Sequence, residues 1–194
     1  MPIANFFIPK ILNKIRKETE YDEDDIDVMR YSLQAILWEV EKTIYLIIIF
    51  SLLSHHWQFF AAMVAVMTIR PSAGGFHSST VWGCFWWTLL GFVLAIFVLP
   101  LIPISTLIII MVAVFSVTIT FIATPIRSKQ MEKVADKSKD KKKKYFATVV
   151  TIIWAVVLVL NQANFLAAPV LWIIFLQNVQ LIIEYLKRKA GQYD

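Results

Sequence analysis

The segment from Arg70 to Cys84 contains the residue types that nucleophilic catalysis by a thiol requires. Cys84 is the only cysteine of the chain, and His77 is one of three histidines. A thiol becomes a strong nucleophile when a neighbouring base takes its proton, and histidine is a common base for this purpose. Arg70 is a candidate for stabilising the thiolate, an oxyanion or a substrate carboxylate. These residue types favour cysteine chemistry.

The spacing of His77 and Cys84 does not by itself bring the two side chains together. On a straight helix these positions share a face but lie about 10 Å apart along the axis, beyond hydrogen-bond reach. The pair forms only if His77 leaves helical geometry and the chain folds back toward Cys84. Gly74 and Gly75 permit such a break through a positive φ angle, and we expect one at Gly75 if the fold-back depends on it.

A hydroxyl side chain just before the next helix would cap its amino terminus. The candidates are Ser78, Ser79 and Thr80. Cys84 would then lie just past the first turn, where the helix dipole favours a thiolate only weakly. His77 would therefore provide most of the activation.

Both ends of this segment also have structural interpretations. A lone cysteine in an apolar span is usually a small buried hydrophobic residue, and Arg70 at the end of a span is most simply an interfacial anchor. A membrane histidine is more often functional, because polar groups are costly in lipid. The spacing alone leaves the choice open.

The composition predicts an integral membrane protein. Of the 194 residues, 58% are hydrophobic and 17% are charged, and the mean hydropathy is +0.65. Arg70 is the only permanent charge from Thr43 to Pro125, and residues 145–183 have none. A soluble protein could not cover two such blocks with polar surface. The net charge of +5 does not indicate nucleic-acid binding, because nine of the nineteen bases lie at 127–144, next to apolar segments.

We expect an all-α fold with six transmembrane or membrane-embedded helices, the second of them short enough to be tilted or re-entrant. The approximate spans are 33–53, 57–69, 80–99, 104–123, 145–160 and 165–183. The basic residues 127–144 are expected to form a loop, and this loop and the bases after the last span should be cytoplasmic. Counting spans then places both termini and the segment 70–80 on the cytoplasmic side.

The expected organisation has a charged arm at 1–30, a single membrane domain at 31–189 and a cytoplasmic tail at 190–194. The arm places apolar residues opposite basic and polar ones, a pattern typical of a helix in the headgroup plane. A solvated charged linker is the alternative for the acidic run that follows it.

The order Arg70, Gly75, His77 and, after six further residues, Cys84 resembles the signature of the accessory gene regulator B (AgrB) family of membrane peptidases. The resemblance extends to Pro125 at the end of a middle span. It also includes the lysine-rich segment that ends in Lys141, Lys142, Lys143, Lys144 and Tyr145. Length, hydropathy and the charged amino terminus fit as well.

The resemblance implies a cysteine endopeptidase of the bacterial plasma membrane that matures a quorum-sensing peptide. Cys84 would be the nucleophile and His77 its base, with Arg70, Gly75 and Ser78 supporting the substrate or the transition state. Cys84 would cut the carboxy-terminal tail from a precursor resembling AgrD. An internal thiol or hydroxyl would then attack the acyl-enzyme thioester and close a thiolactone or lactone. No third catalytic residue, metal or cofactor is implied.

The lysines Lys141, Lys142, Lys143 and Lys144 are candidates for capturing the acidic tail of the precursor. Their alternative role is to hold the segment inside and to contact anionic lipid. Membrane lipids and a second copy of the chain are further candidate partners. Two other classes compete with the peptidase: a small transporter whose pathway Arg70 and His77 line, and a non-catalytic membrane scaffold.

Overall fold

A computed structural model describes residues 2–18, 22–75, 80–126 and 137–190. Every regular element in these ranges is helical, as predicted. The chain divides into two compact units, 1–53 and 54–194, and each is described separately below.

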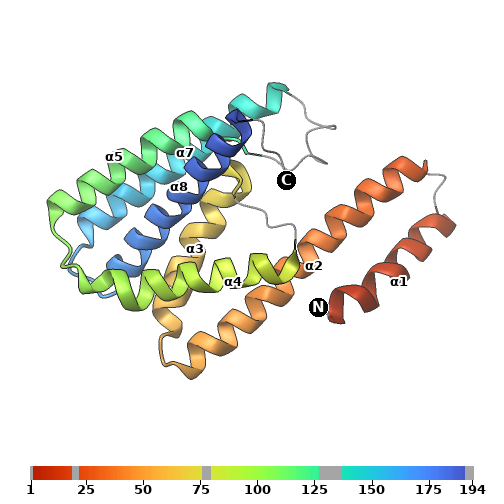
Figure 1. Cartoon of the computed structure of the whole chain (residues 1–194), viewed down its shortest axis with the longest axis horizontal. Helices are drawn as coiled ribbons and strands as arrows, with labels where there is room; N and C mark the ends of the chain where they lie inside the picture. The colour runs from red at the N-terminus through yellow and green to blue at the C-terminus, as the bar shows by residue number, and fades with distance from the viewer. Residues whose placement is uncertain (1, 19–21, 76–79, 127–136, 191–194) are drawn as a thin grey trace. The chain divides into compact units, whose positions relative to one another are not determined.

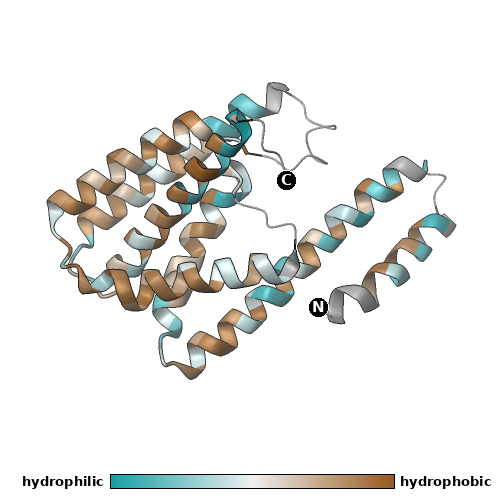
Figure 2. Ribbon diagram, viewed as in Figure 1, coloured by the Kyte–Doolittle hydropathy of each residue, from teal (hydrophilic) through white to brown (hydrophobic). Residues whose placement is uncertain are grey.

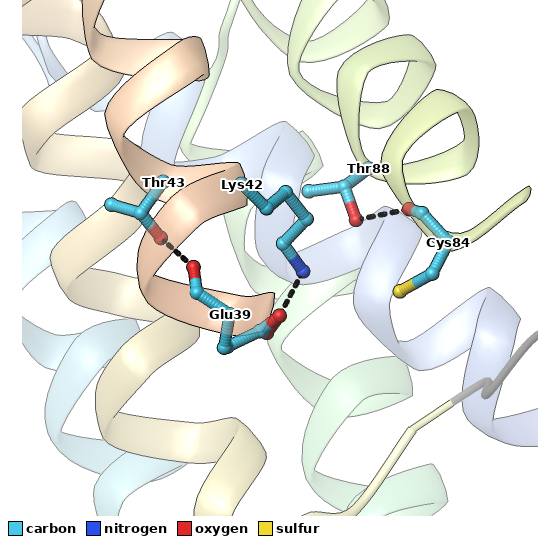
Figure 3. A network of polar contacts seen from close by, with 5 residues as sticks. All are labelled: Glu39, Lys42, Thr43, Cys84 and Thr88. Atoms are coloured by element: carbon cyan, nitrogen blue, oxygen red, sulfur yellow. Dashed lines mark hydrogen bonds and ion pairs between the residues drawn. The ribbon is translucent and has the colours of Figure 1, made fainter. Parts of the chain in front are cut away.

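The first unit is a pair of helices, α1 (Pro2–Glu18) and α2 (Glu23–Leu52). Ile8 and Leu12 of α1 form a small core with Ile26 of α2. Part of the acidic run, for which a solvated linker was the alternative, is therefore helical and belongs to α2. Within α2, Lys42 pairs with Glu39, and the Thr43 hydroxyl donates to the Glu39 carbonyl at 2.8 Å (Figure 3).

The second unit is a helical bundle (Figure 1). Its elements are α3 (His56–Ala73), α4 (Val81–Val93), the π-helix η1 (Leu94–Val98), the 3-10 helix η2 (Leu99–Leu101), α5 (Thr106–Ala123), α7 (Lys137–Leu160) and α8 (Ala167–Lys189). α8 contacts α3, α5 and η1, whereas α5 packs along α7. α8 is also the most deeply buried of the long apolar helices, so it forms the centre of this unit.

Among the residues that the structure describes, four helices are long and apolar enough to cross a membrane. They are Trp82–Leu101, Thr106–Ala123, Asp140–Leu160 and Ala167–Lys189. In Figure 2 the ribbons of these helices are mostly brown, the colour of hydrophobic residues, and the lysine-rich part of α7 is teal. Of the other two expected spans, 33–53 coincides with the second part of α2 apart from its last residue, and 57–69 lies within α3. α3 carries His56, Gln58 and Arg70, which lower its mean hydropathy.

The ends of the helices differ in part from those expected. The chain after α4 tightens into η2 at Pro100, where proline was predicted to end the span. By contrast, α7 begins at Lys137, whereas the span was expected to begin at Tyr145. Lysine is a good helix former. Asp140, in the first turn of α7, interacts favourably with the positive end of the helix dipole.

Candidate functional site

Cys84 lies at the start of α4, just past the first turn, as predicted. Thr80 is the cap, because its hydroxyl accepts a hydrogen bond from the Gly83 amide at 3.1 Å. The Cys84 amide donates to the Thr80 carbonyl at 3.1 Å. The Thr88 hydroxyl donates to the Cys84 carbonyl at 2.8 Å, one turn further along (Figure 3). These bonds fix the backbone that carries the thiol.

Arg70 lies in the last turn of α3, which ends in a glycine turn. The Gly74 amide donates to the Arg70 carbonyl at 2.8 Å, and Gly74 has a φ of 82° and a ψ of −163°. This backbone region is accessible essentially only to glycine. The positive φ expected of the Gly74–Gly75 pair is therefore found at Gly74, and Gly75 does not have one.

Arg70 and Cys84 both line a small cavity of about 30 Å³. Polar side chains from α4 and α8 share it: Thr88, Gln177 and Gln180. The remaining lining is apolar and consists of Val66, Trp87, Gly91, Phe92, Ile173 and Leu176. The volume exceeds the roughly 10–15 Å³ that one water molecule needs, so a water molecule or a single carbonyl group would fit beside the thiol.

Gly75 is buried next to this cavity. A Cβ atom added to it would lie 3.2 Å from Arg70 Nε and 3.3 Å from Gln177 Nε2. The Gln177 carboxamide also donates to the Gly74 carbonyl at 3.1 Å. The side chains of Arg70 and Gln177 therefore both lie beside Gly75, although Gln177 is distant from the other two residues in sequence.

The glycine turn has a second neighbour in the segment after α5. The Ile126 amide donates to the Ala73 carbonyl at 3.0 Å. A Cβ atom on Gly74 would lie 2.0 Å from the Ile126 carbonyl oxygen, so only glycine fits there. The Thr124–Pro125 peptide that precedes Ile126 is cis.

His77 and Ser78 lie outside the described residues, so their part in the site stays a prediction. The four lysines lie outside the cavity, in the first turns of α7. Lys141, Lys142 and Lys143 are exposed, whereas the Lys144 ammonium lies 4.1 Å from the centre of the Phe121 ring. Among the described residues, no three His, Cys, Asp or Glu side chains are grouped as a metal site requires.

The sequence reasoning missed Thr88, Gln177 and Gln180. A usable signal was present for the two glutamines, because amide side chains inside an apolar span are costly and often functional. Their closeness to Cys84 had no such signal, because it depends on how α8 packs against α4.

The chain matches the model of the family described as "Accessory gene regulator B" over residues 8–182. A protein of Clostridium beijerinckii named "Putative AgrB-like protein" is 28% identical over 160 residues, which cover 82% of this chain and 78% of that protein. "Putative AgrB-like protein 1" of Clostridium perfringens (strain 13 / Type A) is 18% identical over 179 residues, or 92% and 96% of the two chains. No solved structure matches. The family match covers Arg70, Gly75, His77 and Cys84, and the chain belongs to the accessory gene regulator B family, which acts in the processing of autoinducers.

Proposed function

We propose that this protein is a membrane-embedded cysteine endopeptidase that cleaves and cyclises an AgrD-like precursor peptide. The observation that carries the proposal is the cavity that Cys84 shares with Arg70, within a chain of the AgrB family. A thiol at the start of a capped helix, beside a guanidinium and two amide side chains, has the surroundings that acyl transfer requires.

In the first half of the reaction, His77 takes the proton of the Cys84 thiol, and Sγ attacks the carbonyl carbon at the cleavage junction. The resulting oxyanion is stabilised by hydrogen-bond donors at the cavity. The carbon–nitrogen bond then breaks, and the amine of the departing tail takes the proton from His77. The peptide stays bound to Cys84 as a thioester.

In the second half, a thiol or hydroxyl of the precursor loses its proton to His77 and attacks the thioester carbonyl. The ring closes, and the Cys84 sulfur leaves as a thiolate and regains its proton. Exchange between two thiols is close to isoenergetic, so the intermediate conserves acyl reactivity that hydrolysis would lose. A site that excludes water at this stage would favour the cyclic product over hydrolysis of the thioester.

The proposal includes a membrane arrangement of six spans, with an amphipathic amino-terminal helix and both termini in the cytoplasm. The active site then faces the cytoplasm, where the precursor is made. The basic segment that precedes and begins α7 supports this orientation, since positive residues near span ends favour the cytoplasmic side. The division into an arm at 1–30, a membrane domain and a short tail belongs to the same proposal.

The proposed binding of the precursor tail rests on the positive charge and the exposure of three lysines. Lys141, Lys142 and Lys143 are exposed at the start of α7 and could attract an acidic precursor tail. Anionic lipid and a second copy of the chain are further proposed partners.

The test uses purified protein in liposomes and a synthetic precursor that has an amphipathic start, a central cysteine and an acidic tail. We expect Cys84→Ala and His77→Ala to abolish cleavage, and Cys84→Ser to leave at most a small fraction of it. Mass spectrometry should detect the acyl-enzyme and the cyclic product in the wild type.

The matched control is Gln162→Met, because Gln162 accepts a hydrogen bond from Thr106 in an exposed turn. This variant should cleave normally. Cleavage by Cys84→Ala at the wild-type rate would exclude the cysteine mechanism, whereas the absence of cleavage by the wild type would leave the transporter and scaffold alternatives.

A further inference from the structure

Gln177 is a polar side chain in a place where lipid and apolar neighbours make polarity costly. It lies in α8, within a candidate membrane span, and only 4% of its surface is exposed. An amide buried there without a hydrogen-bond partner would destabilise the fold. Its Nε2 donates to the Gly74 carbonyl at 3.1 Å, so it bonds to the turn that ends α3.

This bond and a backbone bond from Ile126 connect the turn to two other parts of the chain. The Ile126 amide donates to the Ala73 carbonyl at 3.0 Å, and the Ile126 carbonyl oxygen would lie 2.0 Å from a Cβ on Gly74. A Cβ on Gly75 would meet Gln177 Nε2 at 3.3 Å and Arg70 Nε at 3.2 Å. The turn is therefore enclosed by the backbone at Ile126 and by the Gln177 carboxamide.

The same carboxamide lines the cavity of Cys84. Arg70 lines it too, and the Gly74 amide that follows Arg70 in the turn bonds to the Arg70 carbonyl at 2.8 Å. A displacement of the turn would therefore move Arg70 relative to Cys84. Gln177 connects the fixed central helix α8 to the element that carries the guanidinium.

We infer that Gln177 is a positioning residue of the Cys84 site, which holds the Arg70–Gly75 turn against α8 and so sets the place of the guanidinium at the cavity. The catalytic part of this inference rests on the proposed function. The positional part does not, because it concerns only Arg70, Gln177 and the surroundings of the thiol.

The adjacent residue Asn178 has a different role. Its Oδ1 accepts a hydrogen bond from the Thr120 hydroxyl at 2.9 Å, and its Nδ2 donates to the Ile174 carbonyl at 2.9 Å. These bonds connect α8 to α5 and to its own backbone, and Asn178 does not line the cavity. Asn178 therefore joins α8 to α5, whereas the adjacent Gln177 bonds to the turn that carries Arg70.

The kinetic test substitutes Gln177→Met, which keeps most of the side-chain volume and removes the donor. With the synthetic precursor in liposomes, we expect kcat to fall about 10–100-fold, since a displacement of about 1 Å at a reacting centre has an effect of that size. KM should stay within about twofold, because binding outside the cavity is unchanged. Arg70→Met should have a similar effect, and the double variant should be no worse than the more affected single variant. The control Gln162→Met removes an exposed amide contact and should change neither constant.

A second measurement works even if no peptide is cleaved. The rate of Cys84 alkylation by iodoacetamide should change in Arg70→Met and in Gln177→Met in the same direction, and the double variant should add nothing. Unchanged alkylation in both single variants, or effects that multiply in the double variant, would overturn the inference. Normal kcat in Gln177→Met with an active wild type would also overturn it. Failure of the wild type to cleave would instead count against the proposed function, and the alkylation result would still decide the role of Gln177.

Discussion

At the scale of single residues, the position of Arg70 determines how the site can be interpreted. An arginine at the end of a span can serve as an interfacial anchor, with its head group directed to water. Here its side chain lines the Cys84 cavity, and its Nε lies beside Gly75. A guanidinium in that position can act on charge that develops at the thiol or at the carbonyl it attacks.

Arg70→Lys should therefore recover only part of the activity that Arg70→Met loses. Lysine supplies a point charge, but it does not reproduce the planar fork that a guanidinium presents. Precursor cleavage under single-turnover conditions measures this, with membrane yield as the control for insertion. Full activity in Arg70→Ala would reduce Arg70 to an anchor.

The two glycines of the turn should respond differently to the same substitution. Gly74→Ala requires a glycine-only backbone conformation, which costs about 1–3 kcal/mol, and it creates a clash with the Ile126 carbonyl oxygen. Gly75→Ala meets only the ends of two flexible side chains, Arg70 and Gln177. We expect Gly74→Ala to lower the Tm in detergent, and Gly75→Ala to fold normally but cleave slowly.

Thermal unfolding and cleavage, measured on the same samples, separate the two effects. Equal losses of Tm in both variants would contradict this assignment of roles.

At the residue scale, the sequence predicted a glycine break after Arg70 and a helix cap at Ser78, Ser79 or Thr80, because both features depend on local residue types. The structure confirms the break at Gly74 and a cap at Thr80. The sequence could not predict which glycine takes the positive φ, since this depends on the approach of Ile126. For the same reason it missed Gln177, whose place in the site depends on the packing of α8.

At the scale of elements, α7 joins a basic surface directly to a candidate membrane span. The lysines were expected in a loop, but they occupy the first turns of the helix. The helix orients them unequally: Lys141, Lys142 and Lys143 are exposed, whereas Lys144 lies over Phe121 of α5. A cation over an aromatic ring contributes about 0.5–1 kcal/mol at an exposed site, so Lys144 also contributes to packing.

Replacing Lys141, Lys142 and Lys143 together by Gln should raise KM for a precursor with an acidic tail and flatten its salt dependence. The attraction acts over a Debye length of about 8 Å at physiological salt. Because only substrate binding is weakened, kcat should stay nearly unchanged. Lys144→Gln is the comparison within the same helix and should have a smaller effect on KM.

Cleavage in liposomes across a salt series, with acidic-tailed and neutral-tailed precursors, gives the measurement. If the triple Gln variant affects both precursors alike, the lysines do not recognise the tail, and a role in lipid contact and topology remains.

Hydropathy predicted the long apolar elements well and their ends poorly. The four helices able to cross a membrane correspond to four expected spans, because continuous apolar runs of this length have few alternatives. The start of α7 was missed because charge was taken to mark a loop, although lysine is compatible with a helix.

At the scale of the whole molecule, the number of candidate spans between Cys84 and the basic residues 127–144 determines whether the two lie on the same side of the membrane. Two candidate spans, Trp82–Leu101 and Thr106–Ala123, separate the start of α4 from residues 127–144. If both cross the membrane, the chain returns to the same side. The proposed cytoplasmic placement of Cys84 therefore does not depend on whether α2 and α3 also cross the membrane.

Single cysteines introduced into a Cys84→Ala background can test the two parts of the topology separately. Ala163→Cys lies in the exposed turn between α7 and α8, and we expect it to react with an impermeant maleimide on intact cells. Ser128→Cys and Gln192→Cys should react only after permeabilisation, because positive residues near spans favour the cytoplasm. Ser54→Cys, in the turn before α3, should react from outside if α2 and α3 both cross. Labelling of Ser54→Cys only after permeabilisation, with Ala163→Cys still external, would reduce the spans to four and leave Cys84 cytoplasmic. External labelling of Ser128→Cys would reverse the orientation and, with it, the side on which the precursor is cut.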